Sequence, residues 1–123
     1  MQLPNLLRDL KTAMPFSPYY SEVEPTRGQI DEMAGLVLLE FGASWCGHCL
    51  ALEPDLKKSL AQRRDIQHLR IADGRGKPLG RSFRVKLWPT LILLHDGQVI
   101  AELVRPTAAE VERALAALPA TDE

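Results

Sequence analysis

Residues 36–49 read LVLLEFGASWCGHC, a nearly unbroken apolar run followed by two cysteines that are separated by two residues. Within residues 36–41 only Glu40 is charged, which is the pattern of a central strand buried on both faces. Beyond the cysteines, Leu52, Leu56 and Leu60 fall on one side of a helix, which we expect Pro54 to kink. The pair Cys46 and Cys49 is therefore predicted to lie where a buried strand leads into a helix.

This position has a chemical consequence for Cys46. Unpaired backbone N–H groups and the dipole at a helix N-terminus favour an anion, and such sites lower a thiol pKa from about 8.5 to roughly 3.5–7.5. We therefore predict that Cys46 attacks a substrate disulfide and that Cys49, one turn into the helix, resolves the mixed disulfide. A purely structural disulfide is disfavoured, because closing so short a loop constrains the unfolded chain weakly.

The rest of the chain predicts alternating strands and helices, hence an α/β fold. Two capping boxes, Thr26 with Gln29 and Thr107 with Glu110, mark helix starts, and Asp96-Gly97 indicates a two-residue hairpin turn. The predicted elements are a helix over 3–14, a short strand over 19–23, a helix over 26–35, strands over 36–41 and 66–71, a short helix over 81–85, strands over 90–95 and 98–104, and a terminal helix with Val111, Leu115 and Leu118 inward. Residues 1–18 form an N-terminal extension and 19–123 the domain.

The amino-acid composition argues against several classes of function. The 123 residues include 46% hydrophobic and 25% charged residues, which are ordinary values for one globular domain. Fifteen Lys and Arg against sixteen Asp and Glu give a formal net charge of -1, so the overall charge offers no bias towards nucleic acid or acidic lipid. Charged residues among the first 14 argue against a signal peptide, and no apolar run suits a membrane span. We expect a cytoplasmic protein.

Residues 19–118 resemble the thioredoxin superfamily at three independent places. These are the motif Trp45-Cys46-Gly47-His48-Cys49 after an apolar strand, Pro54 five residues later, and Trp88-Pro89-Thr90 before a hairpin. The resemblance implies a thioredoxin-like fold with a central mixed sheet flanked by helices. It also implies a thiol–disulfide oxidoreductase whose redox centre is the cysteine pair itself, without metal, nucleotide or flavin.

The resemblance also implies roles for residues around the pair. Pro89 matches the family's cis-proline, and Trp88, Pro89 and Thr90 would align a substrate chain. Glu40 matches the family's buried acid, which carries protons to and from the resolving cysteine, and we expect its burial to raise its pKa. We expect Trp45 to cap the helix and shield the sulfurs.

Four places depart from the family pattern, and one of them is Trp88, which is larger than the aliphatic residue usual there. His48 stands where thioredoxin usually has proline, which gives the Cys-Gly-His-Cys form of protein disulfide isomerase. Gly42 replaces an aromatic residue, and we expect the Trp88 indole to fill the space. Arg105-Pro106 replaces a small residue at the rim of the groove.

The predicted partners are protein disulfides and an upstream thiol reductant or reductase, with the protein acting as a reductase. One alternative is an oxidase or isomerase of exported proteins, and another is a redox-inert module that binds peptides. A third is a zinc-binding regulator, although zinc needs four ligands and only His48, His68 and His95 would accompany the two cysteines.

Overall fold

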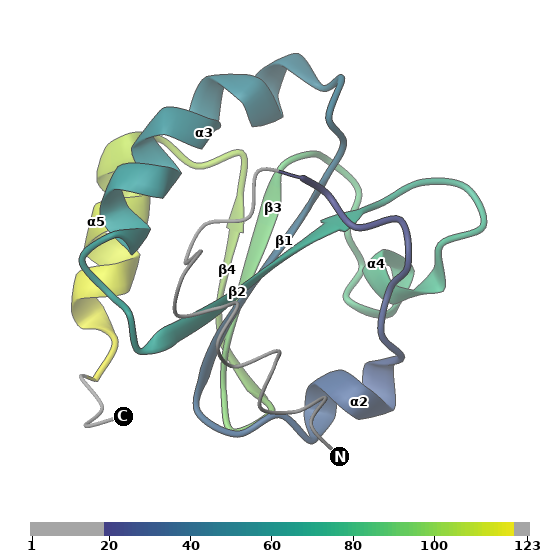
Figure 1. Cartoon of the computed structure of the whole chain (residues 1–123), viewed down its shortest axis with the longest axis horizontal. Coiled ribbons are helices and arrows are strands. Elements are labelled where there is room, and N and C mark those ends of the chain that lie inside the picture. Colours follow the sequence, from purple (N-terminus) through teal and green to yellow (C-terminus); the bar gives the residue numbers. More distant parts are fainter. Residues whose placement is uncertain (1–18, 120–123) are drawn as a thin grey trace.

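The computed structural model describes residues 19–119, so the extension 1–18 and its predicted helix over 3–14 lie outside the described residues. Helices and strands alternate along most of the chain (Figure 1). In order they are α2 (Arg27–Asp31), β1 (Leu36–Gly42), α3 (Gly47–Leu60), β2 (Ile66–Ala72), α4 (Pro78–Ser82), β3 (Thr90–His95), β4 (Gln98–Val104) and α5 (Ala108–Ala117).

The strands form one mixed sheet in the order β2-β1-β3-β4. Strand β1 runs parallel to β2 and antiparallel to β3, and β4 completes an antiparallel hairpin with β3. The predicted strand over residues 19–23 is reduced to a single parallel bridge between Ser21 and Ile71 at the β2 edge. The α/β class and the mixed sheet predicted from the sequence are confirmed.

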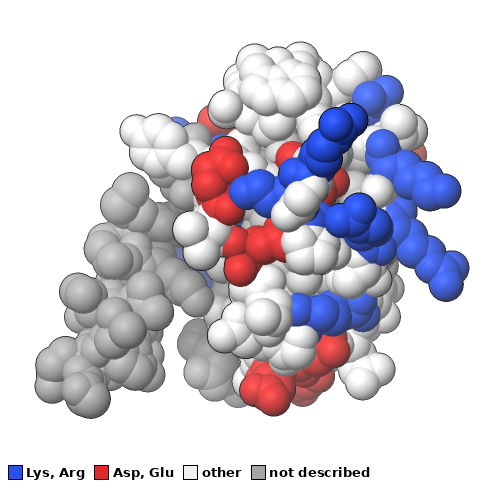
Figure 2. Space-filling model, turned by 90° about the vertical axis from the view of Figure 1, so that its right-hand side faces the viewer, with Lys and Arg blue, Asp and Glu red and all other residues white. Residues whose placement is uncertain are grey.

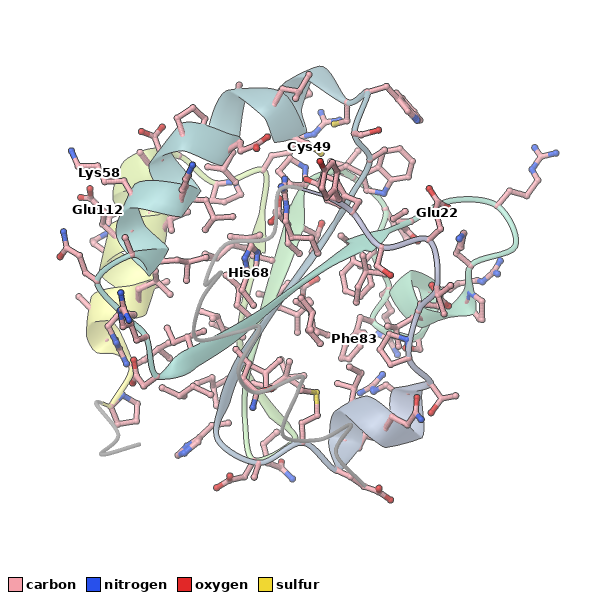
Figure 3. All side chains as sticks on the ribbon, in the orientation of Figure 1. Glu22, Cys49, Lys58, His68, Phe83 and Glu112 are labelled. Carbon is pink, nitrogen blue, oxygen red and sulfur yellow. The ribbon has the colours of Figure 1, made fainter. Side chains whose placement is uncertain are left out.

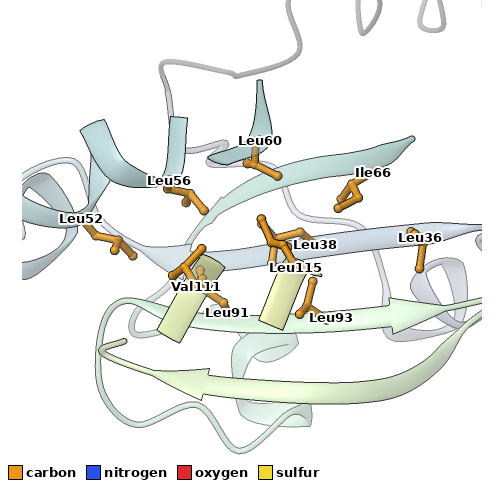
Figure 4. Close-up of a cluster of buried hydrophobic side chains, with 10 residues drawn as sticks. All are labelled: Leu36, Leu38, Leu52, Leu56, Leu60, Ile66, Leu91, Leu93, Val111 and Leu115. Carbon is orange, nitrogen blue, oxygen red and sulfur yellow. The ribbon is translucent and has the colours of Figure 1, made fainter. Parts of the chain in front are cut away.

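Two helical layers cover the sheet, with α3 and α5 on one face and α2 and α4 on the other (Figure 1). Because side chains alternate along a strand, Leu36 and Leu38 of β1 pack beneath α3 and α5, in the cluster that Figure 4 shows. Val37, Leu39 and Phe41 pack on the opposite side. Every residue of β1 is buried, as predicted, and the alternation places Glu40 on the α3 and α5 side.

Local sequence signals set most element boundaries. Both predicted capping boxes are formed, and Asp96 and Gly97 have φ values of 52° and 81°, as a two-residue hairpin turn requires. The prediction for α4 was wrong at both ends. Pro78, whose ring favours helical φ, begins the helix before Arg81, and the helix ends at Ser82, before the predicted end at Val85. Helix α2 ends at Asp31, earlier than the predicted stop at Gly35. Within residues 19–119 the helices are too short or too polar to cross a bilayer.

Candidate active site

The two cysteines lie at the start of α3, as predicted. Cys46 is the N-cap residue, with φ −81° and ψ 121°, and its Sγ accepts a hydrogen bond from the backbone N–H of Cys49 at 3.3 Å. The helix is therefore capped by the Cys46 sulfur, and the expectation that Trp45 caps it was wrong. A sulfur that accepts from a helix N-terminal N–H is placed where negative charge is favoured.

The two sulfurs differ in environment. Cys46 is 7% exposed and Cys49 only 1%, so Cys46 is the more accessible of two buried residues. Burial raises the pKa of Cys49 to about 11, and its interactions with Cys46 act in the same direction, whereas Tyr20 and the Ala43 backbone act against them. Cys49 is therefore protonated at neutral pH and must lose a proton before it can attack.

Aromatic side chains surround the pair. Trp88 and Tyr20 pack against the cluster formed by Ala43 and the two cysteines. Trp45 is 75% exposed and meets the Trp88 ring edge-on, with centroids 5.5 Å apart. The Trp88 indole N–H donates to Asp73 at 2.9 Å. Trp88 thus packs against the cluster that contains both cysteines, whereas Trp45 is largely exposed.

The peptide bond between Trp88 and Pro89 is cis, as predicted. Pro89 lines a groove with His48 and Arg105, among other residues. Arg105 holds this segment through two hydrogen bonds, from its side-chain Nε to the Trp88 carbonyl at 2.8 Å and from its backbone N–H to the Pro89 carbonyl at 2.9 Å. Thr90 is buried and its hydroxyl donates to the Leu87 carbonyl at 2.6 Å, so its side chain fixes the loop instead of facing the groove.

Glu40 lies in a row of polar side chains beneath α3. In the sheet register Arg70 is opposite Glu40, and the bridge at Ser21 brings Tyr20 alongside Arg70. The Glu40 carboxylate accepts from Arg70 Nε at 3.0 Å and from the Tyr20 hydroxyl at 2.6 Å, and it pairs with His68 Nε2 at 2.9 Å. Figure 3 shows Cys49 near the end of the sheet and His68 farther along it.

The expected burial of Glu40 is confirmed, but the expected direction of its pKa shift was wrong. Burial acts to raise the pKa of Glu40, yet His68, Arg70 and Tyr20 together lower it below its ordinary value. The carboxylate is therefore ionised at neutral pH. Burial, reinforced by the neighbouring Glu40 charge, raises the pKa of Tyr20, so this phenol keeps its proton.

The space at Gly42 is filled by Tyr20 and Cys49, so the expectation that Trp88 fills it was wrong. A methyl group added to Gly42 would lie 2.6 Å from Cys49 Sγ and 3.0 Å from the Tyr20 hydroxyl. Only glycine at this position lets the two side chains approach the strand so closely.

Three residues of this site were not predicted from the sequence: Tyr20, His68 and Arg70. The signal for His68 and Arg70 is their spacing of two in β2, which puts both on the Glu40 side of the sheet. The signal for Tyr20 is the missing aromatic residue at Gly42, which leaves room for a large side chain from the neighbouring edge. No cluster of three or more metal-binding side chains occurs within residues 19–119.

Beside the site lies a segment rich in positive charge. Residues 74–86 contain five Lys and Arg and no Asp or Glu. Arg75 and Lys77 share a hollow with Trp45 and Asp73, which connects this basic segment to the active-site rim. Figure 2 shows basic side chains gathered on this face of the molecule, with acidic ones between them.

Comparison with known proteins decides the family. The Thioredoxin family model matches residues 23–117. The chain belongs to the thioredoxin family. It is 30% identical over 80 residues to thioredoxin H2-1 of Oryza sativa subsp. japonica, covering 65% of this chain and 58% of that protein. It is 42% identical over 65 residues to protein disulfide-isomerase A2 of Pongo abelii, covering 50% of this chain and 12% of that protein.

Among solved structures, reduced thioredoxin 2 from Pseudomonas aeruginosa PAO1 is 44% identical, with a TM-score of 0.74 over 81% of this chain and 94% of that one. This likeness extends to the fold as well as the sequence. The matched region of this thioredoxin-family chain nevertheless spans only about 58% of the length of the first two curated relatives.

Proposed function

We propose that this thioredoxin-family protein is a thiol–disulfide oxidoreductase that reduces protein disulfides. The observation that carries the proposal is the geometry of the pair, with Cys46 at the N-cap of α3 and Cys49 hydrogen-bonded to its sulfur. Trp88, which precedes the cis-proline Pro89, packs beside both sulfurs. This arrangement offers one accessible nucleophile and a second thiol within reach of it.

The reaction proceeds in two exchanges. The Cys46 thiolate attacks one sulfur of a substrate disulfide, so a Cys46–substrate disulfide forms and the other substrate sulfur leaves with the electron pair. Cys49 then loses its proton and attacks Cys46 Sγ, forming the Cys46–Cys49 disulfide and releasing the second substrate sulfur as a thiolate. The substrate is reduced by two electrons, the pair is oxidised by two, and the leaving thiolates take up protons from solvent.

The surroundings of the pair suggest how each residue contributes. Glu40 is the base on the sheet side of Cys49, while His48 and Pro89 line the groove that would receive an extended substrate chain. Arg105 fixes the groove by holding the Trp88 carbonyl. The redox centre needs no further group, because the two cysteines themselves carry the electrons.

Partners and compartment follow from this chemistry. The protein would take electrons from an upstream thiol reductant or reductase and pass them to protein disulfides. The basic segment beside Trp45 favours partners that carry acidic side chains near the reacting disulfide. A reductase operates where thiols are kept reduced, and we propose the cytoplasm.

A second candidate function is an oxidase or isomerase of exported proteins. Two observations favour it: His48 lies between the cysteines, and the chain is 42% identical over 65 residues to a protein disulfide-isomerase. A residue between the cysteines that favours the Cys46 thiolate would stabilise the reduced pair, which makes the disulfide a stronger oxidant.

Insulin reduction tests the proposed function. In the presence of dithiothreitol the wild type should accelerate insulin precipitation, and Cys46→Ser should abolish the acceleration. Cys49→Ser should instead accumulate a Cys46–insulin mixed disulfide that is visible by mass, because nothing resolves it. A wild type without activity, or a Cys46→Ser variant that retains it, would contradict the proposal. If the wild type instead oxidises reduced substrate faster than it reduces insulin, the second candidate function holds.

A further inference from the structure

We propose that Tyr20 is a catalytic residue that relays a proton between Cys49 and Glu40. This inference rests on the proposed disulfide exchange and deepens it, since it names the group that activates the resolving thiol. Its hydroxyl donates to Glu40 Oε2 at 2.6 Å, and the Tyr20 side chain packs against the cluster that contains Cys49. The phenol is therefore the group that joins the buried carboxylate to the second sulfur.

Gly42 makes this contact possible. The position where a side chain of residue 42 would begin is 2.6 Å from Cys49 Sγ and 3.0 Å from the Tyr20 hydroxyl, so both atoms border the same point on β1. A larger residue at position 42 would separate the hydroxyl from the sulfur. Gly42 and Tyr20 thus act together in the proposed relay, although they come from different segments of the chain.

The Tyr20 ring is held in place from two sides. Arg70 lies over its face, with the guanidinium carbon 4.1 Å from the ring centroid, and the same guanidinium donates to Glu40 at 3.0 Å. The hydroxyl proton points at the ionised Glu40 carboxylate, so the Tyr20 oxygen keeps a lone pair that can take the Cys49 proton when Cys49 attacks. A fixed ring and an aligned proton are what a relay requires.

Every proton is accounted for when the cysteine pair is oxidised. As Cys49 attacks Cys46 Sγ, its S–H proton passes to the Tyr20 oxygen, and the tyrosine proton passes to Glu40 Oε2. The departing substrate thiolate then takes up a proton from solvent, and Glu40 releases its proton to solvent. Tyr20 ends the cycle unchanged, and Glu40 is charged again.

Several charged or titratable groups surround this relay and will influence its pH dependence. They are Glu40 on β1, His68 and Arg70 on β2, and Cys46 and Glu53 on α3, the last 3.7 Å from the Arg70 guanidinium. Because Arg70 and His68 also contact Glu40, their variants would disturb more than the relay. The test therefore alters Tyr20 itself.

A stopped-flow reaction with 5,5′-dithiobis(2-nitrobenzoate) separates the two exchanges. Attack by Cys46 releases one nitrothiobenzoate, and resolution by Cys49 releases a second. Tyr20→Phe keeps the ring over Arg70 but removes the hydroxyl, so the second phase should slow by about tenfold and require a higher pH, while the first phase keeps its rate. Tyr19→Phe removes a hydroxyl from a neighbouring residue that is 76% exposed and should change neither phase.

A second variant keeps the test independent of the folding of Tyr20→Phe. Gly42→Ala inserts a methyl group between the hydroxyl and Cys49 Sγ and should slow the same phase. Combining Tyr20→Phe with Glu40→Gln should slow it no further than the slower single variant, because both break one relay. A Tyr20→Phe second phase equal to that of the wild type would overturn the inference alone. A wild type that releases only one nitrothiobenzoate would overturn the proposed disulfide exchange.

Discussion

At the scale of the residue, Glu40 shows that burial alone does not set a pKa. The carboxylate is fully buried, and desolvation by itself would favour the protonated form. Contacts with His68, Arg70 and Tyr20 outweigh desolvation, so the pKa of Glu40 is lowered. The charged carboxylate thus contributes to the free energy of unfolding through its contacts with His68, Arg70 and Tyr20.

Glu40→Gln should destabilise the protein at neutral pH. The substitution leaves the Arg70 guanidinium buried without its main counter-charge, and breaking a buried ion pair costs about 3–5 kcal/mol. Urea unfolding at pH 7 measures the loss. Glu53, 3.7 Å from Arg70 and partly exposed, is the matched control, and Glu53→Gln should cost much less. A Glu40→Gln variant as stable as the wild type would show that the pair does not stabilise the fold.

The same residue predicts a pH dependence of stability. Because the folded pKa of Glu40 is lowered, its contribution is complete above the unfolded pKa of about 4.3 and is lost as pH falls through the folded pKa. The stability advantage of the wild type over Glu40→Gln should therefore shrink below about pH 4.3. Unfolding curves between pH 7 and pH 3 measure this difference in stability. A difference that grows as the pH falls would contradict a lowered pKa for Glu40.

His48 is the residue expected to set the redox poise. It lies between the two cysteines in the chain, and its imidazole lines the groove with Pro89. His48→Pro should therefore make the reduction potential more negative, towards the value of about −270 mV known for thioredoxin. Equilibration with glutathione measures both proteins. An unchanged or less negative potential in the variant would show that His48 does not set the poise.

At the scale of the element, the junction between β1 and α3 could be predicted from the sequence because its signals are local. An apolar run, a Cys-x-x-Cys pair and helical leucine spacing lie within 25 consecutive residues. The capping boxes and the Asp96-Gly97 turn were equally readable, since each depends on neighbouring residues.

The polar row beside Cys49 could not be predicted in the same way. It depends on the register between β1 and β2 and on one bridge at Ser21, which joins residues far apart in the chain. The register brings Arg70 to Glu40, and the bridge brings Tyr20 to both. The apolar run alone predicts that Glu40 is buried. It does not identify Arg70, His68 and Tyr20, the residues that lower the pKa of Glu40 despite its burial.

The basic segment, residues 74–86, predicts a charge preference for partners. Opposite charges accelerate encounter, and screening by salt weakens this effect. Arg75→Glu combined with Arg81→Glu should lower kcat/KM for a disulfide peptide with acidic flanks by about threefold or more at low salt. The matched control, Arg64→Glu with Arg113→Glu, changes net charge equally with exposed residues outside this segment and should have little effect. If both double variants lost kcat/KM equally, the basic segment would have no specific role in partner recognition.

At the scale of the whole molecule, the fold joins two requirements of disulfide exchange. The sheet buries a charged carboxylate beneath α3, while the α3 N-terminus holds Cys46 at the surface end of the core. In the proposed exchange, Cys46 is therefore the thiol that meets a substrate, and Cys49 is the thiol that is activated from the sheet side. The proposed exchange requires the two sulfurs to act as one two-electron redox couple.

Equilibration of the wild type with glutathione buffers, followed by alkylation and mass measurement, tests that central claim most directly. We predict that Cys46 and Cys49 pass together from two alkylated thiols to one internal disulfide, with a two-electron transition between about −270 and −180 mV, the values for thioredoxin and protein disulfide isomerase. Two cysteines that stay reduced across this range, or that accumulate separate glutathione adducts, would contradict the assignment of the pair as the redox centre.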